Sequence, residues 1–152
     1  MDRRIRVPKD KSDLIDKLVR GEEYPNGPFR LRADVLSFAA MYGFRRGRRA
    51  QIEESLEPIR QDVFERSGQD QLINLLALAA TKDPSCLANS AEAVQARITV
   101  FEEYANGGLE LLRQELHGLD DPLDRLLLLI EQERESGVQE GSVQYDLSRY
   151  LS

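Results

Sequence analysis

The feature that most constrains the fold is a long run of apolar residues at helical spacing between residues 89 and 116. These positions, which step by three or four, are Val94, Ile98, Phe101, Ala105, Leu109, Leu112 and Leu116. The period is that of one face of an α-helix, sustained over about six turns. Gly107-Gly108 interrupts the run, and each glycine costs about 1 kcal/mol relative to alanine. We therefore expect a core helix that bends or divides at this pair.

Four further segments have helical spacing or helix-boundary residues. They cover residues 10–20, 33–43, 67–81 and 121–130, and the segments 33–43 and 72–81 are apolar enough to be the most buried. Residues 3–7 partly alternate charged and apolar side chains, which is compatible with a short strand. The sequence therefore predicts an all-α fold, a compact bundle of about five helices, with room for one short N-terminal strand.

The length of 152 residues fits one domain. We expect a single helical domain over residues 4–136 and a loosely docked or mobile tail over 137–152, where the periodicity is lost. No apolar run approaches the roughly 18 residues of a membrane span. The charged N-terminus does not resemble a secretory signal, and Cys86 is the only cysteine. These features favour a cytoplasmic protein.

Charge is divided unequally along the chain. Residues 1–50 hold 13 Lys/Arg against 7 Asp/Glu, a net charge of +6, whereas residues 51–152 hold 8 against 20, a net charge of −12. Such asymmetry is typical of proteins with a polyanion-binding end. It is also what two halves show when they attract each other, either within one fold or across a homodimer. The sequence leaves both interpretations open.

The most specific local feature is a cluster of arginines. The guanidinium fork of arginine matches phosphate geometry, so these side chains are candidates for contacts with the DNA backbone. Such contacts would depend strongly on salt and would not read sequence. The alternative is that the same arginines pair with the acidic half of the chain. The candidates are Arg45, Arg46, Arg48 and Arg49, then Arg30 and Arg32 before the apolar segment 33–43, and Arg4 and Arg6 near the N-terminus.

The order strand, helix, loop, helix over residues 3–43 also resembles a ribbon-helix-helix DNA-binding module. In that arrangement a dimer places paired strands in the major groove. Arg4 and Arg6 would face the groove, and Ile5 and Val7 would face the core. The loop of residues 24–29 is rich in proline, which counts against this alternative.

The sequence shows no recognisable catalytic constellation. His117 is the only histidine and precedes Gly118 at an expected helix end, and Cys86 is most simply a packing residue. Adjacent carboxylates such as Glu102-Glu103 point about 100° apart on a helix, so they do not form a shared acid pair. Nucleotide-binding loops are missing as well. We therefore expect no enzymatic activity, no cofactor and no metal site; a nuclease would need carboxylates gathered from separate helices.

Four segments are distinctive together in their order and spacing. They are GPFRLRADVLSFAAMYGFRRGRR (27–49), EPIRQDVFE (57–65), LINLLALAA (72–80) and FEEYANGGLELL (101–112). Together they resemble one small bacterial family, the DNA phosphorothioation-associated (Dnd system-associated) protein 4 family. The resemblance covers roughly Arg4 to Ile130. It implies a cytoplasmic protein that works beside the components of a DNA modification or restriction system, and it carries over no catalytic residue.

These observations lead to one functional hypothesis with two rivals. The hypothesis is a non-enzymatic accessory protein of a phosphorothioation-linked modification and restriction (defence) system, which binds a partner protein, the DNA backbone, or both. Tyr104, Asn106 and Gly107 are candidates for a partner groove. The rivals are a DNA-binding transcriptional regulator that uses the N-terminal half, and a pure protein–protein adaptor.

Overall fold

Helices dominate the computed structural model, which describes the backbone of residues 3–144 and the side chains of residues 3–135. The chain is 65% helical, so the expected all-α fold is confirmed, with one small antiparallel sheet. The elements in this part of the chain are β1 (Arg4–Ile5), the 3-10 helix η1 (Lys9–Lys11), α1 (Ser12–Leu18), α2 (Arg32–Arg46), β2 (Ile59–Arg60), α3 (Gln61–Arg66), α4 (Asp70–Thr81), the 3-10 helix η2 (Pro84–Leu87), α5 (Ala91–Leu116) and α6 (Leu123–Gln144).

The chain divides into two compact units, Met1–His117 and Gly118–Ser152. The first contains every element from β1 to α5, and the second contains α6. Helix α6 starts where the sequence predicts, because the Asp121 carboxylate accepts a hydrogen bond from the Leu123 N–H at 3.0 Å. It continues to Gln144, past the expected start of the tail at residue 137; residues 145–152 of that tail lie outside the described residues. No helix in the described part is both long and apolar enough to cross a membrane.

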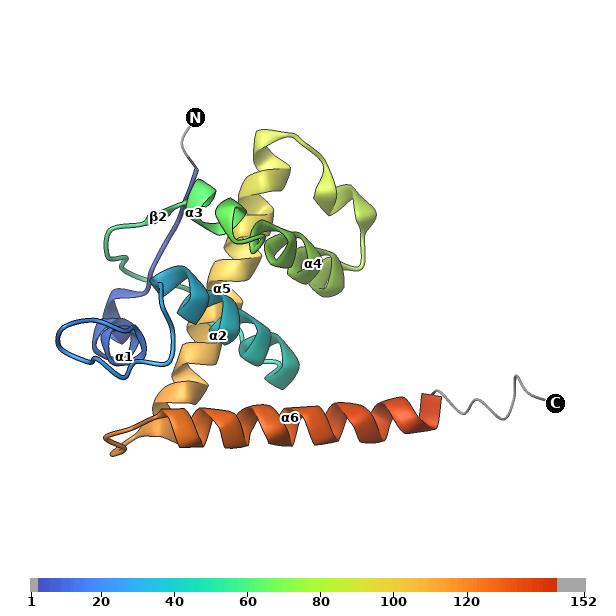
Figure 1. The fold of residues 1–152 in the computed structure, drawn as a ribbon. Coiled ribbons are helices and arrows are strands. Elements are labelled where there is room, and N and C mark those ends of the chain that lie inside the picture. Colours follow the sequence, from blue (N-terminus) through green and yellow to red (C-terminus); the bar gives the residue numbers. More distant parts are fainter. Residues whose placement is uncertain (1–2, 145–152) are drawn as a thin grey trace. The chain divides into compact units, whose positions relative to one another are not determined.

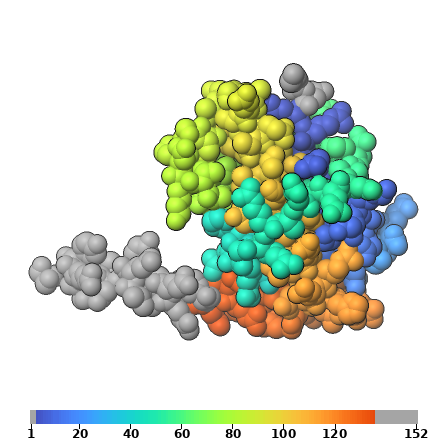
Figure 2. Space-filling view, turned by 180° about the vertical axis from the view of Figure 1, so that it is seen from behind, coloured from blue at the N-terminus to red at the C-terminus, as the bar shows by residue number. Residues whose placement is uncertain are grey.

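Helix α5 is the axis of the first unit, and α2 and α4 lie against it (Figure 1). Its N-terminus is capped by Ser90, whose hydroxyl accepts the Ala93 N–H at 3.1 Å. The residues of α5 that contribute to the core are mainly the predicted apolar face. Figure 2 shows the α2 and α5 segments side by side at the surface of this unit. The pair α2–α5 is the main packing interface of the fold.

The expected division of α5 at Gly107-Gly108 is wrong, because the helix runs without interruption from Ala91 to Leu116. The glycines are there for packing. A β-carbon on Gly108 would lie 2.6 Å from the carbonyl carbon of Ala39, and one on Gly107 would lie 2.6 Å from that of Arg48. A β-carbon on Gly43 of α2 would lie 2.8 Å from the Gly108 nitrogen. The missing side chains therefore let the backbones of α2 and α5 approach closely.

Helix α4 is less central than its sequence predicts. Only Ile73, Leu76 and Ala77 of this helix are buried, and Leu75 is 62% exposed. The expectation that residues 72–81 belong to the most buried helices is wrong, whereas that for residues 33–43 is confirmed. The reason is that α4 packs chiefly against α5 and η2, so one side of it still faces solvent.

The short N-terminal strand is confirmed, with Ile5 and Val7 buried and Arg4 and Arg6 more exposed. Its partner is β2 of the same chain, in antiparallel register with Arg4 opposite Arg60. A ribbon-helix-helix module requires the strand to pair with a second copy. In this structure β1 pairs instead with β2 of its own chain, which is not the pairing that the ribbon-helix-helix interpretation requires.

Candidate functional site

The predicted arginine segment lies at the end of α2. The helix extends three residues past the expected end at Gly43, so Arg45 and Arg46 belong to its last turn. There they complement the negative end of the helix dipole. Gly47 then adopts a left-handed conformation with φ of 68°, which ends the helix and directs Arg48 and Arg49 along α5.

Arg48 and Arg49 are both paired with carboxylates of α5. The Nε and Nη2 atoms of Arg48 donate to one oxygen of Glu110 at 3.1 and 2.9 Å. Arg49 donates to Glu103 at 3.4 Å, and its guanidinium lies 5.3 Å from the centre of the Tyr104 ring. These two candidates for phosphate contacts are therefore held by the chain's own acidic half.

The N-terminal candidates are held in the same way. Arg4 donates to Glu57 at 3.1 Å, and the guanidinium of Arg6 lies 3.4 Å from Glu102. Arg30 and Arg32, which flank the start of α2, are exposed and form no ion pair with another described residue. The guanidinium of Arg46 lies 5.7 Å from the centre of the Tyr42 ring.

These pairs answer the question posed by the uneven charge. Arg48, Arg49, Arg4 and Arg6 belong to the basic half of the chain, and each has its partner in the acidic half. One pair runs the other way: Arg113 of α5, in the acidic half, pairs with Asp13 of α1, in the basic half, at 2.9 Å. The two halves therefore attract each other within one copy of the chain.

The candidates for a partner groove take different positions. Tyr104 is half-buried and makes an edge-to-face contact with Phe44, with ring centres 5.4 Å apart. Asn106 and Gly107 are buried. The Asn106 amide donates to the carbonyls of Ala50 and Gln51 at 3.3 and 3.1 Å, which fixes the chain segment after α2 against α5. Asn106 and Gly107 therefore hold the fold together, and Tyr104 alone of the three lies partly at the surface.

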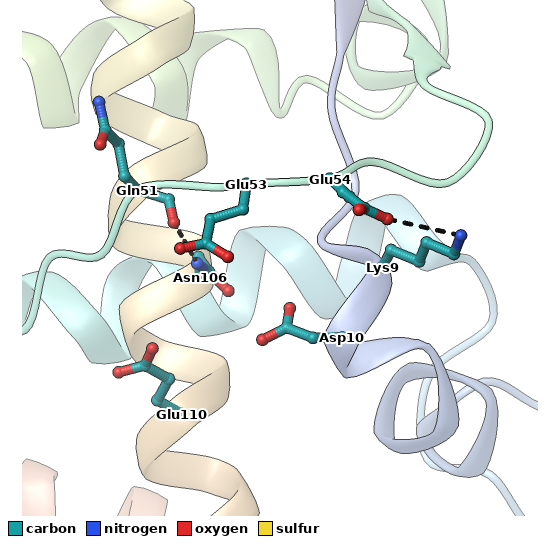
Figure 3. A pocket seen from close by; sticks show the side chains of 7 residues that line it. All are labelled: Lys9, Asp10, Gln51, Glu53, Glu54, Asn106 and Glu110. Atoms are coloured by element: carbon teal, nitrogen blue, oxygen red, sulfur yellow. Dashed lines mark hydrogen bonds and ion pairs between the residues drawn. The ribbon is translucent and has the colours of Figure 1, made fainter.

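The sequence did not single out Lys11, whose ammonium group is buried beside a polar pocket. Its Nζ donates to Asn106 at 2.8 Å and to Asp10 at 2.9 Å, and lies 3.9 Å from Glu110. The pocket holds about 520 Å³, and Figure 3 shows Asp10, Glu53 and Glu110 directed into it. The pocket is lined by Lys9, Asp10, Gln51, Glu53, Glu54, Asn106 and Glu110.

Cations of the chain already offset most of the negative charge round this pocket. Lys9 forms an ion pair with Glu54 at 3.5 Å. Lys11 forms one with Asp10, and Arg48 forms one with Glu110. Among the described residues no group of three or more histidine, cysteine or acidic side chains is arranged to hold a metal ion. The pocket is therefore a polar seam between η1, the segment after α2, and α5.

Glu102 is the other residue that the sequence missed. It is buried in α5 and accepts the backbone N–H of Arg6 at 2.6 Å as well as the Arg6 guanidinium. Burial raises the pKa of Glu102 above its ordinary 4.5, and the hydrogen bond from the Arg6 backbone and the charge of Arg6 only partly oppose this. The sequence did contain a signal of this burial, because Glu102 stands four residues after Ile98 on the apolar face of α5.

The residues considered for catalysis lie in structural positions. His117 is exposed and caps the C-terminus of α5, as the sequence predicts. The backbone carbonyl of Cys86 accepts a hydrogen bond from Arg97 at 2.7 Å, and the carbonyl of Ala88 accepts a second one at 2.8 Å. Arg97 therefore fixes the segment after α4 to α5, and the role of Cys86 in this contact involves its main chain.

The comparisons with known proteins agree with the sequence resemblance. No curated protein and no solved structure matches the chain. One protein family does, over residues 4–150, a range that includes all the elements described above. The chain belongs to the family described as DNA sulphur modification system-associated protein 4.

Proposed function

We propose that this chain is a non-enzymatic accessory protein of a bacterial DNA sulphur modification and restriction system, and that it binds a partner protein of that system. Membership of the family supports the association with such a system. The observation that carries the choice of a protein partner is the pairing of Arg4, Arg6, Arg48 and Arg49 with carboxylates of the same chain.

Contact with DNA through the arginine segment would bring phosphates beside the chain's own acids. Glu110 and Glu103 hold Arg48 and Arg49, and both carboxylates lie within about one Debye length of any phosphate that these arginines could reach. Each exposed pair is worth about 1 kcal/mol or less. Breaking the pairs is therefore cheap, but the released carboxylates would repel the polyanion. A protein partner with apolar or basic contact residues meets no such repulsion.

A second candidate function is contact with the DNA backbone through Arg30 and Arg32. Both side chains are exposed, and neither forms an ion pair with another residue of the described part. This candidate predicts duplex affinity that falls steeply with salt. Gel shifts at two salt concentrations, with wild-type protein and an Arg30→Gln/Arg32→Gln variant, measure it. A shift at low salt that the variant abolishes would favour this candidate.

The experiment that tests the main proposal is an affinity pull-down from the native host, with and without nuclease. We expect identified components of the DNA sulphur modification system to be recovered in both cases. Recovery only in the absence of nuclease would mean that DNA tethers the components, and recovery of none of them would refute the proposal. Magnesium-dependent cleavage of DNA by the purified chain, abolished by changing its carboxylates, would refute the non-enzymatic role.

A further inference from the structure

Helix α6 begins with an unusual density of large aliphatic residues. Six such residues lie between positions 123 and 130. Successive residues of a helix are about 100° apart round its axis, so these six side chains leave no apolar-free sector wider than about 100° round the helix. A helix that packs on one neighbour has a single apolar stripe with polar residues opposite. The start of α6 therefore needs apolar neighbours on more than one side. The six residues are Leu123, Leu126, Leu127, Leu128, Leu129 and Ile130.

Four of these residues have side chains that remain largely open to solvent. Leu127 is 54% exposed, Ile130 46%, Leu128 45% and Leu123 41%. Leu123, Leu127 and Ile130 follow the spacing i, i+4, i+7, which is the pattern by which one helix presents anchors to a groove or to another helix. We refer to these three as the α6 apolar surface; Leu128 lies on another side of the helix. Single exposed leucines are ordinary, but three on one face of one helix form a patch.

The charges round this surface select the kind of partner. Residues 118–135 contain six carboxylates and only two arginines. The carboxylates lie on both sides of the leucines along the chain: Asp120, Asp121 and Asp124 before or among them, and Glu131, Glu133 and Glu135 after them. Arg125 and Arg134 offset part of this charge, and Arg134 lies on the same face as Leu127 and Ile130, but residues 120–125 and residues 131–135 each keep a net charge of −3 + 1 = −2. A complementary surface therefore has apolar side chains at its centre and a net positive charge at both ends.

A second copy of the chain does not meet this requirement. In an antiparallel pair of α6 helices, the acidic start of one copy lies opposite the acidic residues 131–135 of the other. In a parallel pair, each acidic cluster lies opposite itself. Like charges brought together across an interface cost free energy in both arrangements. The charges therefore disfavour self-pairing through α6.

From the apolar surface and its acidic flanks we infer that α6 binds a helix of a partner protein whose apolar stripe is flanked by lysine or arginine. The inference rests on the proposed function, because it specifies the chemistry of the protein partner. The leucines supply the area removed from water, and the carboxylates orient the basic helix and raise its rate of association.

The first test uses the full chain and two designed peptide probes. Both peptides are amphipathic helices with the same leucine stripe, one with lysine and one with glutamate on the polar positions. Fluorescence anisotropy measures the binding of each to the full chain. We expect the lysine peptide to bind at least tenfold more tightly. Equal affinity, tighter binding of the glutamate peptide, or binding of neither overturns the inference.

Matched variants locate the binding on α6. Leu127→Gln/Ile130→Gln removes two anchors, and glutamine is a good helix former at both positions. Leu75→Gln makes one such leucine-to-glutamine change at an exposed site of α4. Circular dichroism verifies that both variants are folded. We expect the α6 variant to lose at least tenfold in affinity for the lysine peptide, and Leu75→Gln to stay within twofold of wild type. Equal affinity of both variants, or a dimer in sedimentation velocity that the α6 variant abolishes, overturns the inference.

The pull-down after nuclease treatment separates this inference from the proposed function. Components recovered with wild type and Leu75→Gln, but not with Leu127→Gln/Ile130→Gln, support both. Components recovered with all three proteins overturn the role of α6 and leave the proposed function standing. Components recovered with none of the three overturn both.

Discussion

The close approach of α2 and α5 at Gly108 makes a quantitative prediction. In Gly108→Ala the new β-carbon would lie 2.6 Å from the carbonyl carbon of Ala39, and still closer to the carbonyl oxygen. Ordinary van der Waals contact begins at 3.4 Å, so the carbon–carbon shortfall alone is 3.4 − 2.6 = 0.8 Å. Both obstructing atoms belong to the main chain of a helix, which cannot rotate out of the way. The interface between α2 and α5 must therefore open.

The free energy of unfolding should fall markedly. A gap of 0.5–1 Å removes roughly a quarter to a half of each dispersion contact, and overpacking a core typically costs about 1–3 kcal/mol or more. Alanine offsets about 1 kcal/mol of this, because it is the better helix former. Since α2–α5 is the main interface of the fold, we expect the cost to lie at the upper end of this range and the net loss to be about 2 kcal/mol. Urea denaturation followed by circular dichroism measures the loss.

Two further variants control the interpretation. Gly21→Ala changes a glycine that has no neighbouring atom within 4 Å of its would-be β-carbon, and should alter stability by no more than about 0.5 kcal/mol. Ala39→Gly combined with Gly108→Ala should not restore stability, because the obstruction is the Ala39 main chain rather than its methyl group. A Gly108→Ala protein as stable as wild type, or one rescued by Ala39→Gly, would refute the packing argument.

Three other changes test the buried and half-buried polar contacts. For Glu102, whose pKa is raised on folding, the extra stability is present below the unfolded pKa and is lost as pH rises through the folded pKa. The stability of wild type relative to Glu102→Gln should therefore decline from acid to neutral pH in urea titrations, and a rise would contradict the burial effect. Lys11→Met leaves the Asn106 carbonyl without its donor and should cost about 1–3 kcal/mol in the same assay. Arg113→Gln removes the hydrogen bond that lowers the pKa of Asp13, so NMR titration should show that pKa rise, whereas stability should change by less than about 1 kcal/mol because the pair is exposed.

Local sequence signals predicted the longer helices but not the contacts between them. The period of the apolar residues located α5, and Asp121-Pro122 located the start of α6. The effect of Gly107-Gly108 could not be predicted in this way, because helix propensity counts a glycine only as a cost. Its benefit depends on Gly43, which lies on another helix and becomes a neighbour only when α2 crosses α5. A local pattern cannot show which distant segment will face a glycine.

The same limit applies to the candidate site. The sequence singled out the arginine segment but not its partners, because Arg48 and Glu110 are separated by 62 positions in the sequence. Chain charge alone did not reveal whether the two halves meet in one copy. Glu102 was within reach of sequence reasoning, because an acidic residue in register with Ile98 and Ala105 on an apolar face is out of place. Such a residue needs a buried partner, and the Arg6 backbone supplies one.

Salt dependence can separate the two ways in which this chain could bind. Contact with a DNA backbone releases counterions, so affinity falls steeply with salt, roughly in proportion to the number of phosphates neutralised. A partner helix on the α6 apolar surface derives most of its affinity from apolar area, which salt does not weaken, while the acidic flanks affect mainly the association rate. Arg48 and Arg49, which follow α2, are already neutralised in part by Glu110 and Glu103, and added salt weakens those internal pairs as well. High salt would therefore abolish contact with DNA but leave an α6 complex intact. A complex with an identified system component that survives 0.5–1 M salt, roughly three to seven times physiological ionic strength, would thus exclude the arginines as its main anchor.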